Sequence, residues 1–411
     1  MTWWTPILLL QVASSVLTHP DPHPAAQDAF AFVTDPDRAT VILSQQGMDG
    51  IGYLQMLGSV QPAMGGFDLM DYSPTRAQHG LRARGSVESW IRWAGPDALV
   101  TVSWHWNAPM FLVDEPGREW WRGFYREATT FDLRAALAEP ESAEYMALMR
   151  DIDIIAGQLA LFRNAGIPVF WRPLHEASGG WFWWGGSGPE PFRELWHVLH
   201  ERLVGYHGLD HLIWVYTVGD VMEKKSGPWY PGDDVVDVIS VDLYGRDAEP
   251  AAAWRALSHQ FGETKPLAVS ESDRLPDPDK MIATGQRWAW YSVWSDDHLR
   301  EYRPSDIQTI YASEQAIDRV RLPAWRSSPP GPQPIAPVHV AWHAERKELQ
   351  LATMEPGTRF RYRIYTMNDR TVHWGRGAGA AGWSASDAKP GSYAVRWLTE
   401  SDQGVVWFTV P

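Results

Sequence analysis

The sequence has no cysteine in its 411 residues. Disulfide bonds, thiolate nucleophiles and thiolate metal ligands are therefore all excluded. It also has no long run of Lys and Arg, and its formal net charge is −14. Proteins that bind nucleic acid gather basic side chains on one surface to meet the phosphates, so we expect no nucleic-acid partner. A neutral partner is compatible with this charge.

Long apolar runs are also rare. One begins at Trp3 and ends at Leu17, contains no charged residue, and is shorter than the stretch of about 20 residues that a membrane-spanning helix needs. Its length is typical of the apolar part of an export signal, although no Lys or Arg precedes it. We expect residues 1–24 to be a leader that sends a bacterial protein to the periplasm or outside the cell, with no membrane partner. The alternative is a buried or disordered N-terminal arm.

Tryptophan, by contrast, is abundant: the chain contains 25. Hydrophobic residues make up 45% of the sequence and charged residues 21%, which is typical of a globular protein. Indole rings either fill a core or offer flat apolar faces on which the C–H faces of sugar rings can stack. The abundance of tryptophan therefore indicates a large core, a carbohydrate-binding surface, or both.

Short apolar runs rich in Val and Ile recur at intervals that leave room for a helix between them. Strands alternating with helices are typical of parallel α/β folds, and eight such units favour a closed (β/α)8 TIM barrel over residues 25–322. The segment 143–165 has apolar residues at three- and four-residue steps, which predicts one of the helices. The eight predicted strands are Thr40–Ser44, Ala63–Phe67, Leu99–Trp104, Ile167–Arg172, Leu212–Tyr216, Val235–Asp242, Pro266–Ser270 and Trp288–Trp294.

A Pro-rich segment at residues 323–337 can join neither a helix nor a sheet, which predicts a linker. Residues 338–411 then alternate apolar and polar positions, as in a small all-β, sandwich-like domain. Its aromatic side chains form either a core or a platform for polysaccharide, and we favour a core because alternating aromatics in strands usually face inward. The predicted strands are 338–342, 348–352, 359–366, 391–398 and 405–410, and the aromatics are Tyr362, Tyr365, Trp374, Trp383, Trp397 and Trp407.

One acidic residue, Glu176, lies close in sequence to several tryptophans. If the fourth predicted strand continues past Arg172, the two-residue period places Arg172, Leu174 and Glu176 on one face, which in a barrel is the interior. Glu176 then lies at the carboxyl end of the strand, where barrel enzymes hold their reactive groups. A buried carboxyl among apolar neighbours can keep a proton near neutral pH, so Glu176 is a candidate general acid.

A second acid, Glu271, follows the seventh predicted strand and is expected at the same mouth of the barrel. Two facing carboxyls suffice to cleave a glycosidic bond, because one donates a proton while the other attacks carbon or activates water. The sixth strand ends with Asp242 and Tyr244, and a Tyr hydroxyl there could keep a neighbouring carboxylate ionised. The alternative for Asp237 and Asp242 is that they accept hydrogen bonds from loop amides.

Three further motifs contain residues that could take part in catalysis or binding. His105 lies between two tryptophans after the third strand, where a packed structural role is as plausible as contact with a substrate. Residues 377–382 fit the dinucleotide fingerprint by letters but lack the flanking strand and helix, so we expect a turn. His175-Glu176 begins like a zinc-protease motif, yet Gly179 stands where the second His must be. We expect no metal and no cofactor.

These motifs resemble family 26 of the glycoside hydrolases, a family best known for β-mannanases and part of the clan of retaining (β/α)8-barrel glycosidases. The resemblance is carried by Arg172-Pro-Leu-His-Glu176 and Gly180-Trp-Phe-Trp-Trp-Gly185, where a His precedes the acid in place of the Asn usual in the clan. It extends from Ile42-Leu-Ser-Gln-Gln46 and Gly66-Phe-Asp68 to Ser270-Glu271, roughly over residues 30–320.

The resemblance implies that Glu176 is the general acid/base, Glu271 the nucleophile and Tyr244 the hydroxyl that positions the nucleophile. A retaining mechanism with these groups predicts carboxyls about 5–5.5 Å apart, where an inverting one needs about 6.5–9.5 Å. The residues implied to shape the subsite of the reacting sugar are His105, His175, Trp181, Asp242 and Trp294, together with Arg172.

The function that the resemblance implies is that of an endo-β-1,4-mannanase, a monomer acting on a neutral polysaccharide. One alternative is the same machinery acting on mixed-linkage β-1,3-1,4-glucan or β-xylan, since pocket shape rather than the two acids decides. An alternative of another class is a non-catalytic carbohydrate-binding protein. Such a protein would not need acids at two strand ends.

Overall fold

The computed structural model describes residues 16–58, 60–81, 83, 86–219, 227–245, 249–262, 264–327, 338–343, 346–353, 357–366, 371–386, 388–398 and 403–410. The first 15 residues of the predicted leader and residues 328–337 of the predicted linker therefore lie outside the described residues. Among those described, no helix combines the length and the apolar character needed to cross a membrane.

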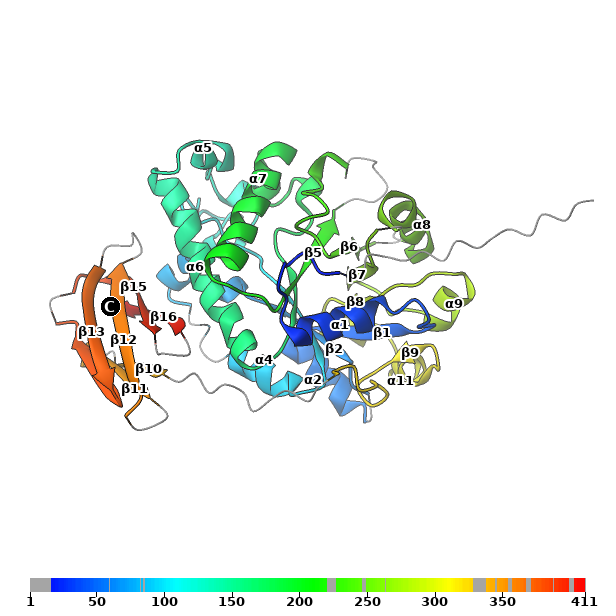
Figure 1. Cartoon of the computed structure of the whole chain (residues 1–411). Helices are drawn as coiled ribbons and strands as arrows, with labels where there is room; N and C mark the ends of the chain where they lie inside the picture. Colours follow the sequence, from blue (N-terminus) through cyan, green and yellow to red (C-terminus); the bar gives the residue numbers. More distant parts are fainter. Residues whose placement is uncertain are drawn as a thin grey trace, which may run out of the picture.

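Eight parallel strands form a closed barrel, which confirms the predicted architecture (Figure 1). The strands are hydrogen-bonded in the order β2-β3-β4-β5-β6-β7-β8-β1, and β1 also pairs with β2, which closes the ring. Each predicted run overlaps one strand, and five of the strands extend one or two residues beyond the predicted end. A short ninth strand pairs with β1. The strands are β1 Val41–Gln46, β2 Met64–Asp68, β3 Leu99–Ser103, β4 Val169–Arg172, β5 Leu212–Val218, β6 Val238–Leu243, β7 Leu267–Ser272, β8 Trp290–Val293 and β9 Ala316–Ile317.

Apolar side chains fill the amino-terminal half of the barrel. Phe170 of β4 and Trp290 of β8 come from opposite sides of the ring, and their ring centroids are 5.1 Å apart. Helix α1 (Pro24–Thr34) packs into the same cluster through Phe30 and Val33 and so closes this end. Because this end is filled, a cavity between the strands can open only at their carboxyl ends.

Helices surround the barrel, and their ends follow local sequence signals. Helix α6 (Ala143–Asn164) matches the predicted segment. The Ser142 side chain caps its start by accepting a hydrogen bond from the Tyr145 amide. Gly166, whose φ is 62°, follows its end. The other α-helices are α2 Met48–Met56, α3 Pro74–Gln78, α4 Ser86–Ala94, α5 Leu133–Ala138, α7 Pro189–His200, α8 Pro250–Phe261, α9 Pro278–Ala283, α10 Asp296–Arg300 and α11 Pro304–Ala312. Single-turn helices are η1 Met70–Tyr72, η2 Trp120–Arg122, η3 Arg126–Ala128, η4 Ala177–Gly179, η5 Trp183–Gly185 and η7 Gly227–Trp229, and η6 Glu201–Tyr206 is a π-helix.

The segments before and after the barrel pack against the amino-terminal ends of its strands. Leu17 is buried, and the Thr18 amide donates to Asp237 at 2.7 Å. Asp237 also accepts from the Trp214 amide, so it serves backbone amides, as the alternative interpretation proposed. After the barrel, the Trp325 indole is buried and donates to the Asp97 carbonyl at 2.6 Å.

The C-terminal part is a small all-β domain, as predicted. Its seven antiparallel strands belong to one sheet of order β10-β11-β14-β13-β12-β15-β16. Strands β13 and β14 were not predicted, because their Gly- and Ala-rich sequence lacks an alternation of apolar and polar residues. The turn expected within residues 377–382 is the bend at Gly379, whose φ is 86°. The strands are β10 Val338–His343, β11 Glu348–Thr353, β12 Arg359–Thr366, β13 Thr371–Ala378, β14 Ala380–Ser384, β15 Gly391–Leu398 and β16 Gln403–Val410.

The aromatic side chains of this domain divide between its core and its surface. Tyr362 and Trp397 are buried together with Phe360, which supports the interpretation of the alternating aromatics as a core. Trp383 is half-buried against the same cluster. Trp374 is different, since 67% of its surface is exposed.

Candidate active site

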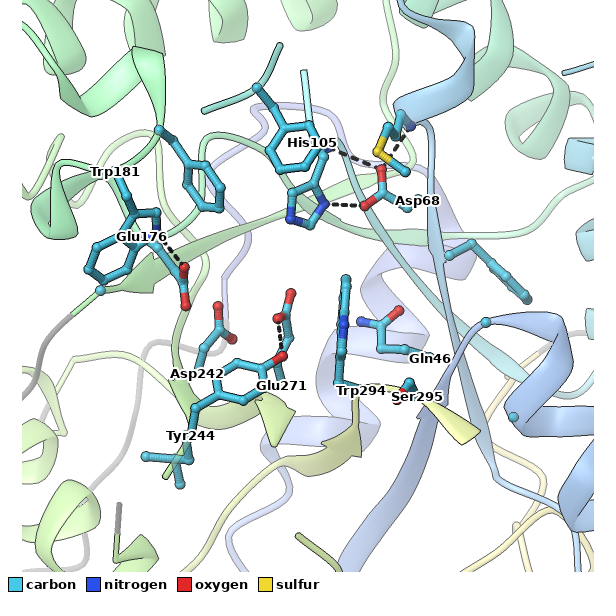
Figure 2. Close-up of a pocket in the computed structure, with 18 of the residues that line it drawn as sticks. Gln46, Asp68, His105, Glu176, Trp181, Asp242, Tyr244, Glu271, Trp294 and Ser295 are labelled. Atoms are coloured by element: carbon cyan, nitrogen blue, oxygen red, sulfur yellow. Dashed lines mark hydrogen bonds and ion pairs between the residues drawn. The ribbon is translucent and has the colours of Figure 1, made fainter. Parts of the chain in front are cut away.

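A cavity of about 1070 Å³ opens at the carboxyl ends of the strands. Figure 2 shows the acidic side chains of Glu176, Asp242 and Glu271 pointing into it. Every strand of the barrel contributes to its wall, as expected for a ligand site in this fold. In strand order, the contributing residues are Gln46, Asp68, His105, Glu176, Gly219, Asp242, Glu271 and Trp294.

Glu176 reaches the cavity by a turn rather than along a strand. Strand β4 ends at Arg172, and both Leu174 (φ 50°) and Glu176 (φ 54°) have left-handed backbone conformations. The expectation that the strand continues to Glu176 is therefore wrong: Leu174 turns into the apolar core, while Arg172 remains in the barrel interior. Residues other than Gly rarely adopt this conformation, so the surrounding structure must hold it.

Two short helices after the turn supply that support. The Gly179 amide donates to the Glu176 carbonyl at 3.0 Å. Gly185 lies against the backbone of Ala177, where a Cβ atom would stand 2.1 Å from the carbonyl oxygen. The backbone of η4 and η5 is therefore packed too closely for any side chain at position 185.

Trp181 lies beside Glu176 at the cavity wall. Its indole N–H donates to Glu176 Oε2 at 2.9 Å, and its ring covers Gly179, where a Cβ atom would meet the indole at 2.1 Å. The Arg126 amide donates to the Trp181 carbonyl at 2.7 Å, which fixes the backbone. The indole remains 39% exposed, so it offers a face to a ligand.

Glu271, at the end of β7, is held by two donors. Tyr244 donates its hydroxyl hydrogen to Glu271 Oε2 at 2.6 Å (Figure 2). Arg172 donates Nη2–H to Glu271 Oε1. Arg172 also donates Nη1–H to Asp242 Oδ2 at 3.0 Å and is fully buried. The predicted hydrogen bond between Tyr244 and a carboxylate is thus confirmed. Both donors favour the ionised form of Glu271.

Burial and mutual repulsion raise the pKa of the carboxyls in the cavity. The pKa of Glu176 is raised to about 7 by burial and by the charge of Glu271, and the effects of Arg172 and Trp181 only partly oppose this rise. Burial raises the pKa of Asp242 to about 8 despite its contact with Arg172. Burial also raises the pKa of Glu271, which Arg172 counteracts.

The proton that the two glutamates retain belongs on Glu176. Glu271 accepts hydrogen bonds from Arg172, a cation, and from Tyr244. Glu176 accepts from the neutral indole of Trp181 and shares a hydrogen bond with the carboxyl group of Asp242. An ion pair stabilises a carboxylate more than a neutral donor does. The two acids are therefore differentiated by their partners: one holds a proton while the other is ionised.

Asp68 and His105 line the opposite wall, and His175 is buried behind His105. His105 Nδ1 contacts Asp68 Oδ2, and His105 Nε2 lies 3.1 Å from His175 Nε2. Burial alone would raise the pKa of Asp68, but its interactions with His105 and the Met70 amide lower that pKa to about 2. Burial lowers the pKa of His175 well below its usual value, so this imidazole is neutral.

The partners of these three side chains define the tautomers. The ionised Asp68 must receive N–H from His105 Nδ1, which leaves His105 Nε2 as the acceptor of an N–H from His175. His175 Nδ1 then carries no proton, which agrees with its burial without a hydrogen-bond partner. Both ring nitrogens of His105 are engaged within the protein.

Most of the predicted site residues come together. Glu176, Glu271, His105, Trp181, Asp242, Tyr244 and Trp294 all line the cavity, and the Trp294 ring lies 5.6 Å from that of His105. Arg172 and His175 do not line it; they are buried beneath its wall.

Several residues of the cavity wall were missed at the level of sequence. Gln46 and Asp68 were quoted only as part of the resemblance, because the predicted strands stop one or two residues short of them; each is the last residue of the observed strand. Phe124, Phe182 and Met70 come from loops, for which the sequence gives no comparable signal. No group of three or more His, Asp or Glu in the described part of the chain could hold a metal ion.

Comparisons with known proteins agree with this geometry. The sequence profile of glycosyl hydrolase family 26 matches residues 18–319. A mannan endo-1,4-β-mannosidase of Thermothelomyces thermophilus is 37% identical over 316 residues, which cover 76% of this chain and 64% of that protein. The chain thus spans just under two thirds of the length of that relative.

Two solved structures are also similar. A GH26-CBM35 β-(1,4)-mannanase of Podospora anserina has 37% identity and a TM-score of 0.73, and the match covers 80% of this chain and 72% of that one. A β-mannanase from a symbiotic protist of the termite Reticulitermes speratus, complexed with a gluco-manno-oligosaccharide, has 28% identity and a TM-score of 0.67, with 76% and 99% covered.

Proposed function

This chain belongs to glycosyl hydrolase family 26, and from this premise we propose that it is a retaining endo-β-1,4-mannanase. The observation that carries the proposal is the pair of glutamates, one in the turn after β4 and one on β7, which line the same cavity and have different hydrogen-bond partners. A non-catalytic binding protein has no need of two carboxyls that differ in protonation.

In the first step, Glu271 attacks the anomeric carbon while Glu176 donates its proton to the departing glycosidic oxygen. Arg172 and Tyr244 keep Glu271 ionised and hold it in place. The proton of Glu176 is available near neutral pH because burial and the neighbouring charge raise its pKa.

In the second step, a water molecule attacks the glycosyl-enzyme ester. Glu176, now ionised, accepts a proton from this water, and Glu271 leaves. Because the anomeric carbon is inverted twice, its configuration is retained. The expected separation of about 5–5.5 Å between the two carboxyls stays a prediction of this mechanism.

Replacing the nucleophile tests the mechanism. Glu271→Ala should lower kcat on mannan by at least about 1000-fold, because the covalent step is lost. Glu194, exposed on α7, provides a matched control: Glu194→Ala should retain wild-type turnover. Comparable hydrolysis by Glu271→Ala and wild type would refute the assignment.

The substrate and the location of the enzyme belong to the same proposal. The named relatives support mannan, and release of reducing sugars from mannan, lichenan and xylan compared side by side tests it. Faster hydrolysis of lichenan or xylan would assign the glucanase or xylanase alternative. Since mannan is a polymer outside the cell, we also propose that the protein is exported, which its presence in the culture medium tests. We further propose that it acts as a monomer, which its mass in solution tests.

A further inference from the structure

The outer face of strands β12 and β13 carries an unusual group of side chains. Arg361 and Arg363 alternate on β12 with the buried Tyr362, and both arginines are exposed. In the register of the sheet, Arg361 lies opposite Arg376, and Arg363 lies opposite Trp374. Residues directly opposite each other point to the same face, so three arginine side chains and one tryptophan side chain share this face. Figure 1 shows the two strands side by side in the C-terminal sheet.

This arrangement is unfavourable for the isolated sheet. Like charges directly opposite each other on neighbouring strands destabilise a pair, as Arg361 and Arg376 do here. None of the ion pairs within the described part of the chain involves Arg361, Arg363 or Arg376. An anion from outside the described structure would relieve this repulsion.

Trp374 adds a flat apolar surface to the same group. It is 67% exposed, while Trp397 of the same domain is 4% exposed and belongs to the core. An exposed indole that belongs to no core cluster and shares a face with cationic side chains is suited to stack on the C–H face of a sugar ring. The guanidinium groups around it can grip carboxylates through paired N–H donors.

The charge of the chain is distributed unevenly. Residues 338–411 contain nine Lys and Arg and seven Asp and Glu, whereas residues 1–337 contain 27 and 43. The acidic barrel repels polyanions, so an acidic ligand can be held only where basic side chains gather. Nucleic acid, with its dense phosphates, needs a more extended basic surface than the few arginines of this sheet provide.

We propose that this face, formed by Arg361, Arg363, Trp374 and Arg376, binds an acidic polysaccharide, a polymer whose sugar rings carry carboxylates. The ring of one sugar stacks on the indole while carboxylates of that sugar and its neighbours meet the guanidiniums. This binding requires no catalysis and is independent of the function proposed for the barrel.

Affinity electrophoresis of the full chain in gels containing polygalacturonate, neutral mannan or no polymer tests the proposal. Polygalacturonate should retard the wild-type chain, and added salt should weaken the retardation. Trp374→Ala and the triple variant Arg361→Gln/Arg363→Gln/Arg376→Gln should each weaken the affinity by about tenfold or more.

The matched control removes the same charge from exposed turns of the same domain. Arg346→Gln/Lys347→Gln/Lys389→Gln should keep the affinity for polygalacturonate within about twofold of wild type. All variants should hydrolyse soluble mannan at the wild-type rate, which reports folding and catalysis separately from binding.

Three results would overturn the proposal. The first is a wild-type chain that polygalacturonate does not retard. The second is an equal loss of affinity in the control triple variant, which would leave only nonspecific charge attraction. The third is equal or stronger retardation by single-stranded DNA at the same charge concentration, which would assign the face to nucleic acid.

Discussion

Three carboxyls share one guanidinium in the cavity. Arg172 is paired with both Asp242 and Glu271, and Glu176 adds a third acid to the same buried space. One positive charge cannot offset three negative charges in a medium of low polarity, so protons must remain on some of these acids near neutral pH. Protonation of this group therefore controls the proposed chemistry.

The pH dependence of kcat/KM should be bell-shaped. Activity is lost at low pH because Glu271 takes up a proton and can no longer attack, and it is lost above about pH 7 because Glu176, whose pKa is about 7, no longer has a proton to donate. Initial rates on mannan measured across the pH range check this. An activity that stays constant well above pH 8 would contradict the role of Glu176 as acid.

Two single substitutions should move opposite limbs of that profile. The Tyr244 hydrogen bond lowers the pKa of Glu271, so Tyr244→Phe should raise this pKa and shift the acidic limb to higher pH. The Trp181 hydrogen bond lowers the pKa of Glu176, so Trp181→Phe should shift the alkaline limb to higher pH. Each variant serves as the control for the other, and a shift of the same limb in both would contradict the assignment.

Asp68 acts on the site through His105. In Asp68→Asn, an amide N–H2 placed at Oδ2 would force His105 to carry its proton on Nε2, facing His175. His175 Nδ1–H would then be buried without an acceptor, which costs about 1–3 kcal/mol. We expect kcat/KM on mannan to fall about tenfold to 100-fold, measured together with the melting temperature. An unchanged kcat/KM would show that the chain of side chains has no role in catalysis.

At the scale of elements, the turn after β4 depends on glycine at position 185. A Cβ atom there would meet the Ala177 carbonyl, which belongs to the backbone and cannot move aside as a side chain can. Gly185→Ala should therefore lower stability by about 1–3 kcal/mol and impair activity by displacing Glu176. Gly52→Ala in α2, where nothing lies within 4 Å, should be neutral or slightly stabilising. Thermal unfolding of both variants compares them directly.

The elements differ in how far the sequence could predict them. Buried parallel strands have continuous apolar sequences, so all eight barrel strands could be found by composition and spacing. Strands β13 and β14 could not, because Gly and Ala leave no alternation to recognise. The turn to Glu176 could not be predicted either, since left-handed Leu and Glu are imposed by tertiary contacts rather than by local preference.

The sequence predicts which residues of the site follow the ends of strands. It does not predict which of them line the cavity and which are buried beneath its wall. A residue at the carboxyl end of a barrel strand points to the cavity, which is why Glu176, Asp242 and Glu271 could be named. The same rule does not distinguish the cavity wall from the layer beneath it. Arg172 and His175 carry the motif that identifies the family, yet they are buried and act on the carboxyls and on His105.

At the scale of the whole molecule, the barrel and the C-terminal sheet have separate cores. Among the described residues, the apolar clusters of the barrel end at Trp325, and the cluster of the sheet lies within residues 342–410. A chain ending at residue 327 should therefore keep kcat/KM on soluble mannan within about twofold of the full chain. A chain ending at residue 323 should melt at a lower temperature, because it loses the buried Trp325 and its hydrogen bond to Asp97. Activity assays and thermal unfolding of the two truncated chains distinguish these outcomes, and inactivity of the longer one would show that the sheet supports the barrel.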